Sequence, residues 1–224
     1  MQYYDFSLDM FARKDDIISS DDSTTAHVRV VHIATKAPDV DVYINDKLAI
    51  PNLKYREFTD YIKLPSGKYN IKIYKTKDNT TPLLDADVLI APKSITTLAA
   101  FSENRKLYLY PLDEVALSNT TPEKAKIRFA NFIENMPPVD VVLSNGVLLY
   151  KNLSFKDLRN YIELPPNTYT FELKLANTDI PLLYVPNANI KSNKYYTLYL
   201  IGLLSDYPEP QMLIPLDGVT YINE

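Results

Sequence analysis

The chain has 224 residues, a hydrophobic share of 46% and a formal net charge of −4. That hydrophobic share is normal for globular proteins and excludes a disordered chain. The acidic balance argues against binding to nucleic acid or to an anionic membrane surface, because both depend on clustered Lys and Arg. The absence of cysteine excludes disulfides, thiolate metal sites and cysteine nucleophiles.

Residues 1–25 form a segment of their own, in which aspartates surround a few scattered aromatic residues. We expect an irregular tail or a short amphipathic helix there. The segment lacks the basic start and continuous apolar core of a signal peptide, so a cytoplasmic location is expected if Met1 is the native start. The longest apolar run, 195–204, is about half of the roughly 20 residues that span a bilayer, so no membrane span is expected.

After this tail the chain contains the same unit twice. The repeat is carried by positions 99 residues apart: Arg29, Pro38, Val40, Asp41 and Val42 recur as Arg128, Pro137, Val139, Asp140 and Val141. From Asn52 onward the displacement becomes 100. A displacement kept over so many positions indicates a duplicated domain. We expect a first domain at residues 26–117, a linker at 118–124 and a second domain at 125–224.

Each copy shows the period of two that is typical of strands. In the first copy, alternating runs at 26–33 and 40–45 are separated by a break at 36–39, and a Leu-Pro turn at 64–67 leads into a further strand. About seven short strands joined by turns are typical of an antiparallel β-sandwich. The predicted fold class is therefore all-β, with two tandem Ig-like or transthyretin-like sandwich domains.

Two stretches of the first copy resemble a known family. VRVVHIATKAPDVDVYIN (28–45) followed by DYIKLPSGKYNIKIY (60–74) resembles the bacterial DUF4397 family, a domain of unknown function often found in tandem. IRFANFIENMPPVDVVLSN (127–145) with NYIELPPNTYTFEL (160–173) resembles a more diverged member. The resemblance covers nearly everything from residue 26 to residue 219. Because many members look exported or surface-attached, it implies the cell surface as the alternative location.

Arg29 with Asp41, repeated as Arg128 with Asp140, is the polar pair present in both copies. Their strands are predicted to be neighbours, so we expect a charge-assisted hydrogen bond across the hairpin. This interpretation gives the pair a framework role. A binding site for a charged ligand is the alternative.

The histidines and glycines predict no metal site and no cofactor. His27 and His32 lie on opposite faces of one strand and cannot converge on a metal, so we expect His32 to be structural and His27 to lie at the surface. With only four glycines, the chain has neither a phosphate-binding loop nor a dinucleotide fingerprint.

Tyrosine is the remaining candidate for function, with 18 copies against no tryptophan. Tyr43 alternates outward with its neighbours, and we predict a binding surface formed by Tyr43, Asp41 and Arg29. Tyr108 and Tyr110, which align with Met212 and Ile214, are expected to pack instead.

The sequence favours a non-catalytic binding or structural module that contacts a protein or a cell-envelope component. A carbohydrate-binding module with exposed tyrosines is the first alternative, and a glycan is accordingly a candidate partner. A hydrolase with carboxylates in an inter-domain cleft is the second alternative. The sequence sets no expectation for the oligomeric state.

Overall fold

The computed structural model describes residues 24–222. The chain divides into two compact units that meet in sequence between Val115 and Ala116, here called domain 1 and domain 2. Each domain consists of eight strands, and no α-helix occurs among the described residues. The prediction of two all-β sandwich domains is confirmed. The predicted tail lies, up to residue 23, outside the described part of the chain.

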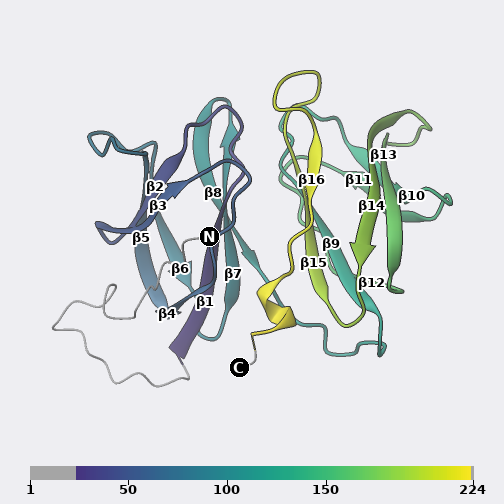
Figure 1. Ribbon diagram of the computed structural model, residues 1–224, viewed down its shortest axis with the longest axis horizontal. Helices are drawn as coiled ribbons and strands as arrows, with labels where there is room; N and C mark the ends of the chain where they lie inside the picture. Colours follow the sequence, from purple (N-terminus) through teal and green to yellow (C-terminus); the bar gives the residue numbers. More distant parts are fainter. Residues whose placement is uncertain (1–23, 223–224) are drawn as a thin grey trace. The chain divides into compact units, whose positions relative to one another are not determined.

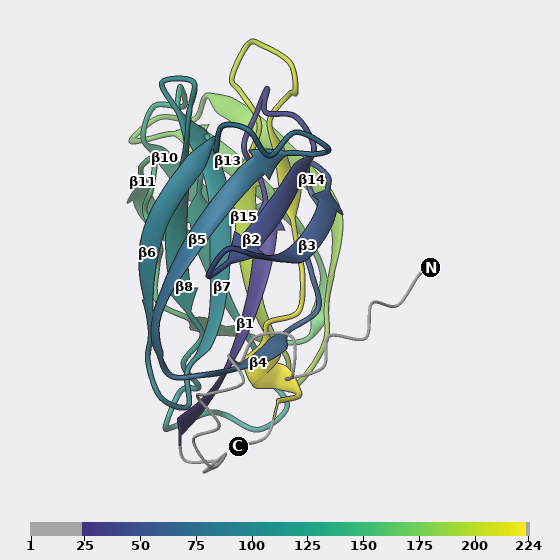
Figure 2. The same cartoon turned by 90° about the vertical axis from the view of Figure 1, so that its left-hand side faces the viewer.

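Domain 1 contains two four-stranded sheets that face each other (Figure 1). One has the order β3-β2-β5-β6 and is seen face-on in Figure 2, and the other has the order β4-β1-β7-β8. The strands are β1 (Thr25–His32), β2 (Val40–Ile44), β3 (Lys47–Leu53), β4 (Ile62–Pro65), β5 (Gly67–Lys75), β6 (Leu84–Ile90), β7 (Ile95–Glu103) and β8 (Lys106–Asp113).

Domain 2 repeats this arrangement strand for strand, with sheets β11-β10-β13-β14 and β12-β9-β15-β16. A short 3-10 helix, η3 (Gly218–Thr220), follows its last strand. The strands are β9 (Ala125–Asn131), β10 (Val139–Leu143), β11 (Leu148–Leu153), β12 (Ile162–Leu164), β13 (Asn167–Leu175), β14 (Pro181–Ile190), β15 (Tyr195–Ile201) and β16 (Gln211–Leu213).

The strand pairing is antiparallel except at one place in each domain. β1 runs parallel to β7, and β9 runs parallel to β15. The immunoglobulin constant-type order places the first, second, fifth and fourth strands in one sheet. Here the first and second strands lie in different sheets. The immunoglobulin type therefore does not fit this order, and the transthyretin-like sandwich is the expected type that remains.

The core of each domain lies between its two sheets. Alternate residues of each strand turn inward, as the period of two requires. In β5 the buried residues are Tyr69, Ile71 and Ile73, and in β13 they are Phe171 and Leu173. Since these are the apolar positions that the repeat matches, both copies bury corresponding side chains.

The largest difference between the domains is the connection between their last two strands. In domain 1, β7 and β8 pair up to Glu103 and Lys106 and are joined by the two-residue turn Asn104-Arg105, both with positive φ. In domain 2, β15 and β16 pair only up to Ile201 and Gln211, and residues 202–210 form a loop. In Figure 1 this loop is the olive arch that extends beyond β16.

This pairing corrects one alignment made from the sequence. Tyr108 pairs with Phe101, and Tyr110 with Ala99. The corresponding pairs of domain 2 are Gln211 with Ile201 and Leu213 with Tyr199. The structural counterparts of the two tyrosines are therefore Gln211 and Leu213, one residue before the predicted Met212 and Ile214.

Candidate functional site

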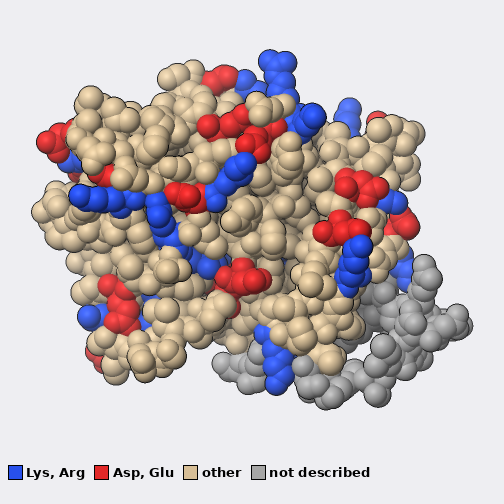
Figure 3. All heavy atoms as spheres, turned by 180° about the vertical axis from the view of Figure 1, so that it is seen from behind, with Lys and Arg blue, Asp and Glu red and all other residues tan. Residues whose placement is uncertain are grey.

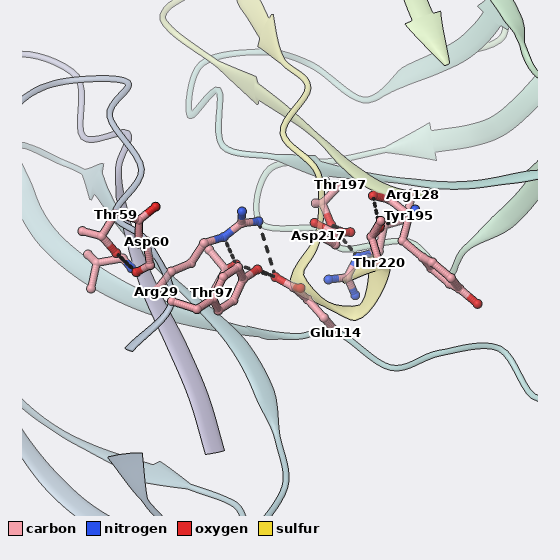
Figure 4. A network of polar contacts seen from close by, with 12 residues as sticks. Arg29, Thr59, Asp60, Thr97, Glu114, Arg128, Tyr195, Thr197, Asp217 and Thr220 are labelled. Carbon is pink, nitrogen blue, oxygen red and sulfur yellow. Dashed lines mark hydrogen bonds and ion pairs between the residues drawn. The ribbon is translucent and has the colours of Figure 1, made fainter. Parts of the chain in front are cut away.

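A buried polar network surrounds Arg29 on β1 of domain 1 (Figure 4). Arg29 is only 4% exposed. Its Nε donates a hydrogen bond to Thr97 Oγ1 at 2.8 Å, and its Nη2 lies 3.4 Å from Glu114 Oε1. The Glu114 side chain is fully buried, so this is an ion pair removed from water. Such a pair is stable only when further hydrogen bonds satisfy its polar atoms.

Those further contacts come from neighbouring strands and from the segment before β4. Thr97 Oγ1 and Tyr61 Oη donate to Glu114 Oε1 at 2.6 and 2.5 Å. The guanidinium carbon of Arg29 lies 4.7 Å from the ring centre of Tyr61 and 5.0 Å from that of Phe58. Burial and the charge of Glu114 raise the pKa of the Tyr61 phenol, which therefore remains a hydrogen-bond donor.

Domain 2 contains the same network with an aspartate in place of the glutamate. Arg128 Nε donates to Thr197 Oγ1 at 2.8 Å, and its guanidinium carbon lies 4.5 Å from the ring centre of Tyr161. Thr197 Oγ1 and Tyr161 Oη donate to Asp217 Oδ2 at 2.7 and 2.6 Å. In both networks the arginine Nε, the threonine hydroxyl and the tyrosine hydroxyl are hydrogen-bonded within the domain, which is the arrangement of a structural framework.

The predicted hydrogen bond between Arg29 and Asp41 is wrong. Because β1 and β2 lie in different sheets, the two side chains are not neighbours across a hairpin. Asp41 instead accepts hydrogen bonds from the backbone N–H groups of Asn52, at 2.7 Å, and Lys77, at 3.2 Å. Both of these residues have positive φ, so Asp41 holds two tight backbone conformations in place.

The second predicted pair, Arg128 with Asp140, is wrong for the same reason. Asp140 accepts hydrogen bonds from the backbone of Asn152 and Asn177 at 2.9 and 3.0 Å. The backbone N–H of Asn152 contributes most to lowering the pKa of the Asp140 carboxyl group. Asp41 and Asp140 are thus equivalent framework residues whose partners are backbone groups.

His32 is fully buried and hydrogen-bonded at both ring nitrogens. Its Nδ1 lies 3.3 Å from the Ala34 backbone N–H and its Nε2 lies 3.0 Å from the Pro38 carbonyl. A backbone N–H donates and a carbonyl accepts, so Nδ1 is the acceptor, Nε2 carries the proton and the ring is neutral. Burial lowers the pKa of His32.

Asn131 occupies the place of His32 in domain 2. Its side-chain oxygen accepts a hydrogen bond from the Ile133 backbone at 3.0 Å, which is the role of His32 Nδ1. His27 is half-buried on the opposite face of β1. Within residues 24–222, no three His, Asp or Glu side chains gather in a way that could hold a metal ion.

The three residues predicted to bind a ligand do not come together. Tyr43 and Asp41 lie on the same face of β2, whereas Arg29 belongs to the other sheet. Tyr43 is half-buried and packs edge-to-face against Tyr74, with ring centres 5.1 Å apart. Tyr43 and Asp41 therefore share a strand face that Arg29 does not reach.

Two ion pairs lie on the outer surface of domain 1. Lys68 lies 2.7 Å from Asp87, and Lys72 lies 2.6 Å from Asp46. On the face of the molecule drawn in Figure 3, basic and acidic side chains are interspersed. That face carries no continuous basic area of the kind that phosphate backbones require.

An open groove of about 520 Å³ lies in domain 2, between the start of β14 and the loop 202–210. Tyr184, on β14, is 60% exposed and Tyr207, on the loop, is 80% exposed. Asp206 and Glu209 are exposed beside them. The full lining is Leu182, Leu183, Tyr184, Leu204, Ser205, Asp206, Tyr207, Glu209 and Pro210. This combination of apolar rings and carboxylates is suited to ligand binding.

The loop that carries Tyr207 is held by hydrogen bonds at its base. The Leu203 N–H donates to the Pro208 carbonyl at 2.8 Å. Asn135, from the segment between β9 and β10, donates to the Leu204 carbonyl at 2.6 Å and accepts from the Leu204 N–H at 2.8 Å. Asn135 therefore fixes the loop to the body of domain 2.

This groove was not predicted from the sequence, although the sequence contains a signal for it. Thr97 and Thr197 are 100 positions apart, whereas the tripeptide Pro-Leu-Asp recurs after 104 positions, at 111–113 and 215–217. The change marks an insertion between the last two strands of the second copy. An inserted loop on a rigid sandwich is a common location for binding residues.

The comparisons with known proteins support the duplication. The family model described as "Domain of unknown function (DUF4397)" matches residues 26–142 and 134–217. The chain belongs to the DUF4397 family. Within this DUF4397 chain, the stretch 28–45 that resembles the family contains an Arg-x-x-His motif, whose two residues, Arg29 and His32, are buried. These two motif residues thus serve the framework. No curated protein matches the chain.

Three solved structures are similar to this DUF4397 chain. The Bacillus anthracis TIE protein is 13% identical, with 84% of this chain and 34% of that chain covered and a TM-score of 0.26. The family CBM26 module CBMbc from Eubacterium rectale Amy13K, solved in complex with maltoheptaose, is 9% identical, with coverages of 87% and 98% and a TM-score of 0.26. A proposed adhesin from Bacteroides ovatus is 9% identical, with coverages of 86% and 95% and a TM-score of 0.24. The chain thus spans about a third of the TIE protein, and similarities at this level identify no ligand.

Replacing Glu114 with Gln is expected to destabilise the DUF4397 chain by about 3 kcal/mol, because it leaves the buried Arg29 charge uncompensated. Urea unfolding of the full chain measures the loss. Asp39→Asn, which neutralises an exposed carboxylate, should change the unfolding midpoint little. Equal midpoints for Glu114→Gln and the native chain would show that the ion pair does not stabilise the fold.

A second expectation concerns acid stability. The unfolded chain binds a proton at His32 below the ordinary pKa of 6.5, whereas the folded chain resists it. Stability should therefore fall as the pH drops below 6.5, by up to about 1.4 kcal/mol per pH unit, until the lowered folded pKa is reached. Thermal melting between pH 7 and pH 5 measures this fall.

His32→Asn is the matched variant, because domain 2 already accommodates Asn131 at this place. All other titrating groups are unchanged in this variant, so the difference between the two melting profiles isolates His32. We expect a shallower loss of stability for the variant. Parallel profiles would mean that His32 titrates alike in the folded and unfolded chains.

Proposed function

We propose that the chain is a non-catalytic binding module whose ligand is a protein or a glycan of the cell envelope. The observation that carries this proposal is the groove of domain 2. Its exposed Tyr184 and Tyr207 stand beside a loop that replaces the tight Asn104-Arg105 turn of domain 1. Among the connections between paired strands, this loop differs most in length between the two copies, which suggests that it has a role of its own, since the shorter turn already completes the fold.

The absence of catalysis is supported by where the carboxylates lie. Glu114 and Asp217 are buried and occupied by Thr, Tyr and Arg side chains, so a substrate does not reach them. Asp206 and Glu209 line the groove but are exposed. Enzymes keep a general-acid carboxyl group protonated by burying it, and exposed carboxylates serve better as hydrogen-bond acceptors.

A loop replacement tests the proposal. In this variant residues 202–210 are exchanged for residues 102–107, which join the same two paired positions in domain 1. Cosedimentation with fragments of bacterial cell envelope is the measurement. We expect the native chain to sediment with the fragments and the variant to remain in solution, with both chains folded by circular dichroism.

Tyr184→Ala serves as a second variant, should the exchanged loop prevent folding. It removes an exposed ring from a strand whose backbone pairing is unchanged, so folding should be preserved. Failure of the native chain to sediment, or equal sedimentation of native chain and variants, would contradict the proposal. Release of shortened ligand during incubation would identify an enzyme instead.

A further inference from the structure

We infer that the groove of domain 2 binds a neutral carbohydrate chain. Tyr207 and Tyr184 would pack against the C–H faces of sugar rings, and Asp206 and Glu209 would accept hydrogen bonds from sugar hydroxyl groups. The inference rests on the proposed function and narrows its ligand from envelope components in general to a glycan.

The two tyrosines supply the apolar part of this site. Most of the ring surface of Tyr207 and of Tyr184 faces water, although both rings line one groove. A tyrosine offers a large flat surface, loses little conformational freedom when it binds and keeps a hydroxyl group for water or ligand. A sugar ring, with an apolar face and a polar edge, matches this surface.

The loop positions Tyr207 before any ligand arrives. The clamp between Asn135 and Leu204, together with the hydrogen bond from Leu203 to Pro208, fixes both sides of the loop. The side chain of Asp206 accepts a hydrogen bond from the Tyr207 N–H at 2.6 Å, which fixes the backbone next to the ring. A site fixed in advance loses less entropy on binding, which matters for a ligand that offers few apolar contacts.

Charge decides between classes of glycan. The groove contains the carboxylates Asp206 and Glu209, and its lining includes no lysine or arginine. Phosphorylated, sulfated or uronic-acid sugars would be repelled there. Hydroxyl groups of neutral sugars can donate hydrogen bonds to the carboxylates, and such charge-assisted bonds are short and strong.

The edge of the sheet argues against a peptide bound as an added strand. β14 is the edge strand of its sheet, and strand addition requires a row of available backbone N–H and C=O groups. Pro181 and Pro186 on β14 have no N–H, and Asn187 interrupts the extended backbone with φ of 60°. Side chains are therefore the main contacts available to a ligand in this groove.

The groove is open, which favours a chain over a single sugar. Sites for small molecules bury most of the ligand surface in an enclosed cavity. The groove of about 520 Å³ is instead open, so neighbouring units of a bound polymer can extend into solvent. We therefore expect affinity to increase with oligosaccharide length until the groove is filled.

The test uses the full chain on a printed array of neutral hexose and N-acetylhexosamine oligosaccharides, followed by calorimetry with the oligosaccharide that binds most strongly. Tyr207→Ala should weaken binding about tenfold through loss of stacking, whereas Tyr207→Phe should stay within about threefold. Glu209→Gln should weaken binding less than loss of the ring does. Tyr221→Ala, which removes an exposed tyrosine of the same domain outside the groove lining, is the matched control and should bind like the native chain.

Treating envelope fragments with periodate or protease distinguishes failure of this inference from failure of the proposed function. Periodate, which cleaves vicinal diols of sugars, should abolish Tyr207-dependent sedimentation, and protease treatment of the fragments should not. Binding that needs Tyr207 but is abolished by protease and survives periodate would identify a protein ligand. The inference would then be wrong while the binding module stands.

Two further outcomes would also overturn the inference. An array on which no neutral oligosaccharide binds would contradict it directly. Affinity that falls steeply between 50 and 500 mM salt would indicate a cationic ligand, because binding of a neutral sugar depends little on ionic strength.

Discussion

The buried arginine of each domain is the interaction on which its architecture depends. Arg29 is removed from water, and its desolvation is offset by the joint contacts of Thr97, Glu114 and Tyr61. These partners belong to β7, to the segment after β8 and to the segment before β4. The network therefore assembles only when the first and last strands of the domain are both in place. It also fixes register, since a slip of one residue would turn the guanidinium into the apolar core.

A domain held together by this network tolerates changes of loop length outside the residues of the network. The connection after β7 and the one after β15 differ in length, while Arg128, Thr197 and Asp217 repeat the hydrogen bonds of the arginine Nε and of the threonine hydroxyl in domain 1. Loops at the ends of a rigid sandwich can vary at little cost in folding free energy. Domain 1 thus represents the framework with a minimal turn, and domain 2 shows the same framework with a loop that lines a groove.

Local patterns in the sequence predicted the fold well but not the partners of its polar residues. The period of two follows from the alternation of side chains along each strand, and the fixed displacement follows from the duplication, so both can be read from the sequence. The partner of Arg29 cannot be read from the sequence in this way, because Thr97 is 68 positions away and reaches Arg29 through a parallel strand pairing. The tripeptide Pro-Leu-Asp, repeated at 111–113 and 215–217, was misleading as well, because it aligns the last strands with a displacement of 104 whereas their pairing gives 103. Asp217 corresponds in space to Glu114. The Glu114 N–H donates to the carbonyl of Ile95, the first residue of β7, and the Asp217 N–H donates to the carbonyl of Tyr195, the first residue of β15.

The loop that lines the groove depends on the glycine at position 202. Gly202 has φ of 104°, and a Cβ atom there would overlap the Glu209 carbonyl group on the opposite side of the loop. Any larger residue would push the two sides apart and break the hydrogen bond from Leu203 to Pro208. In a chain with four glycines, one of them stands where the two copies diverge. A glycine with positive φ, a longer loop and exposed tyrosines thus occur together in residues 202–210, and they connect the local chemistry of the loop to the proposed binding site.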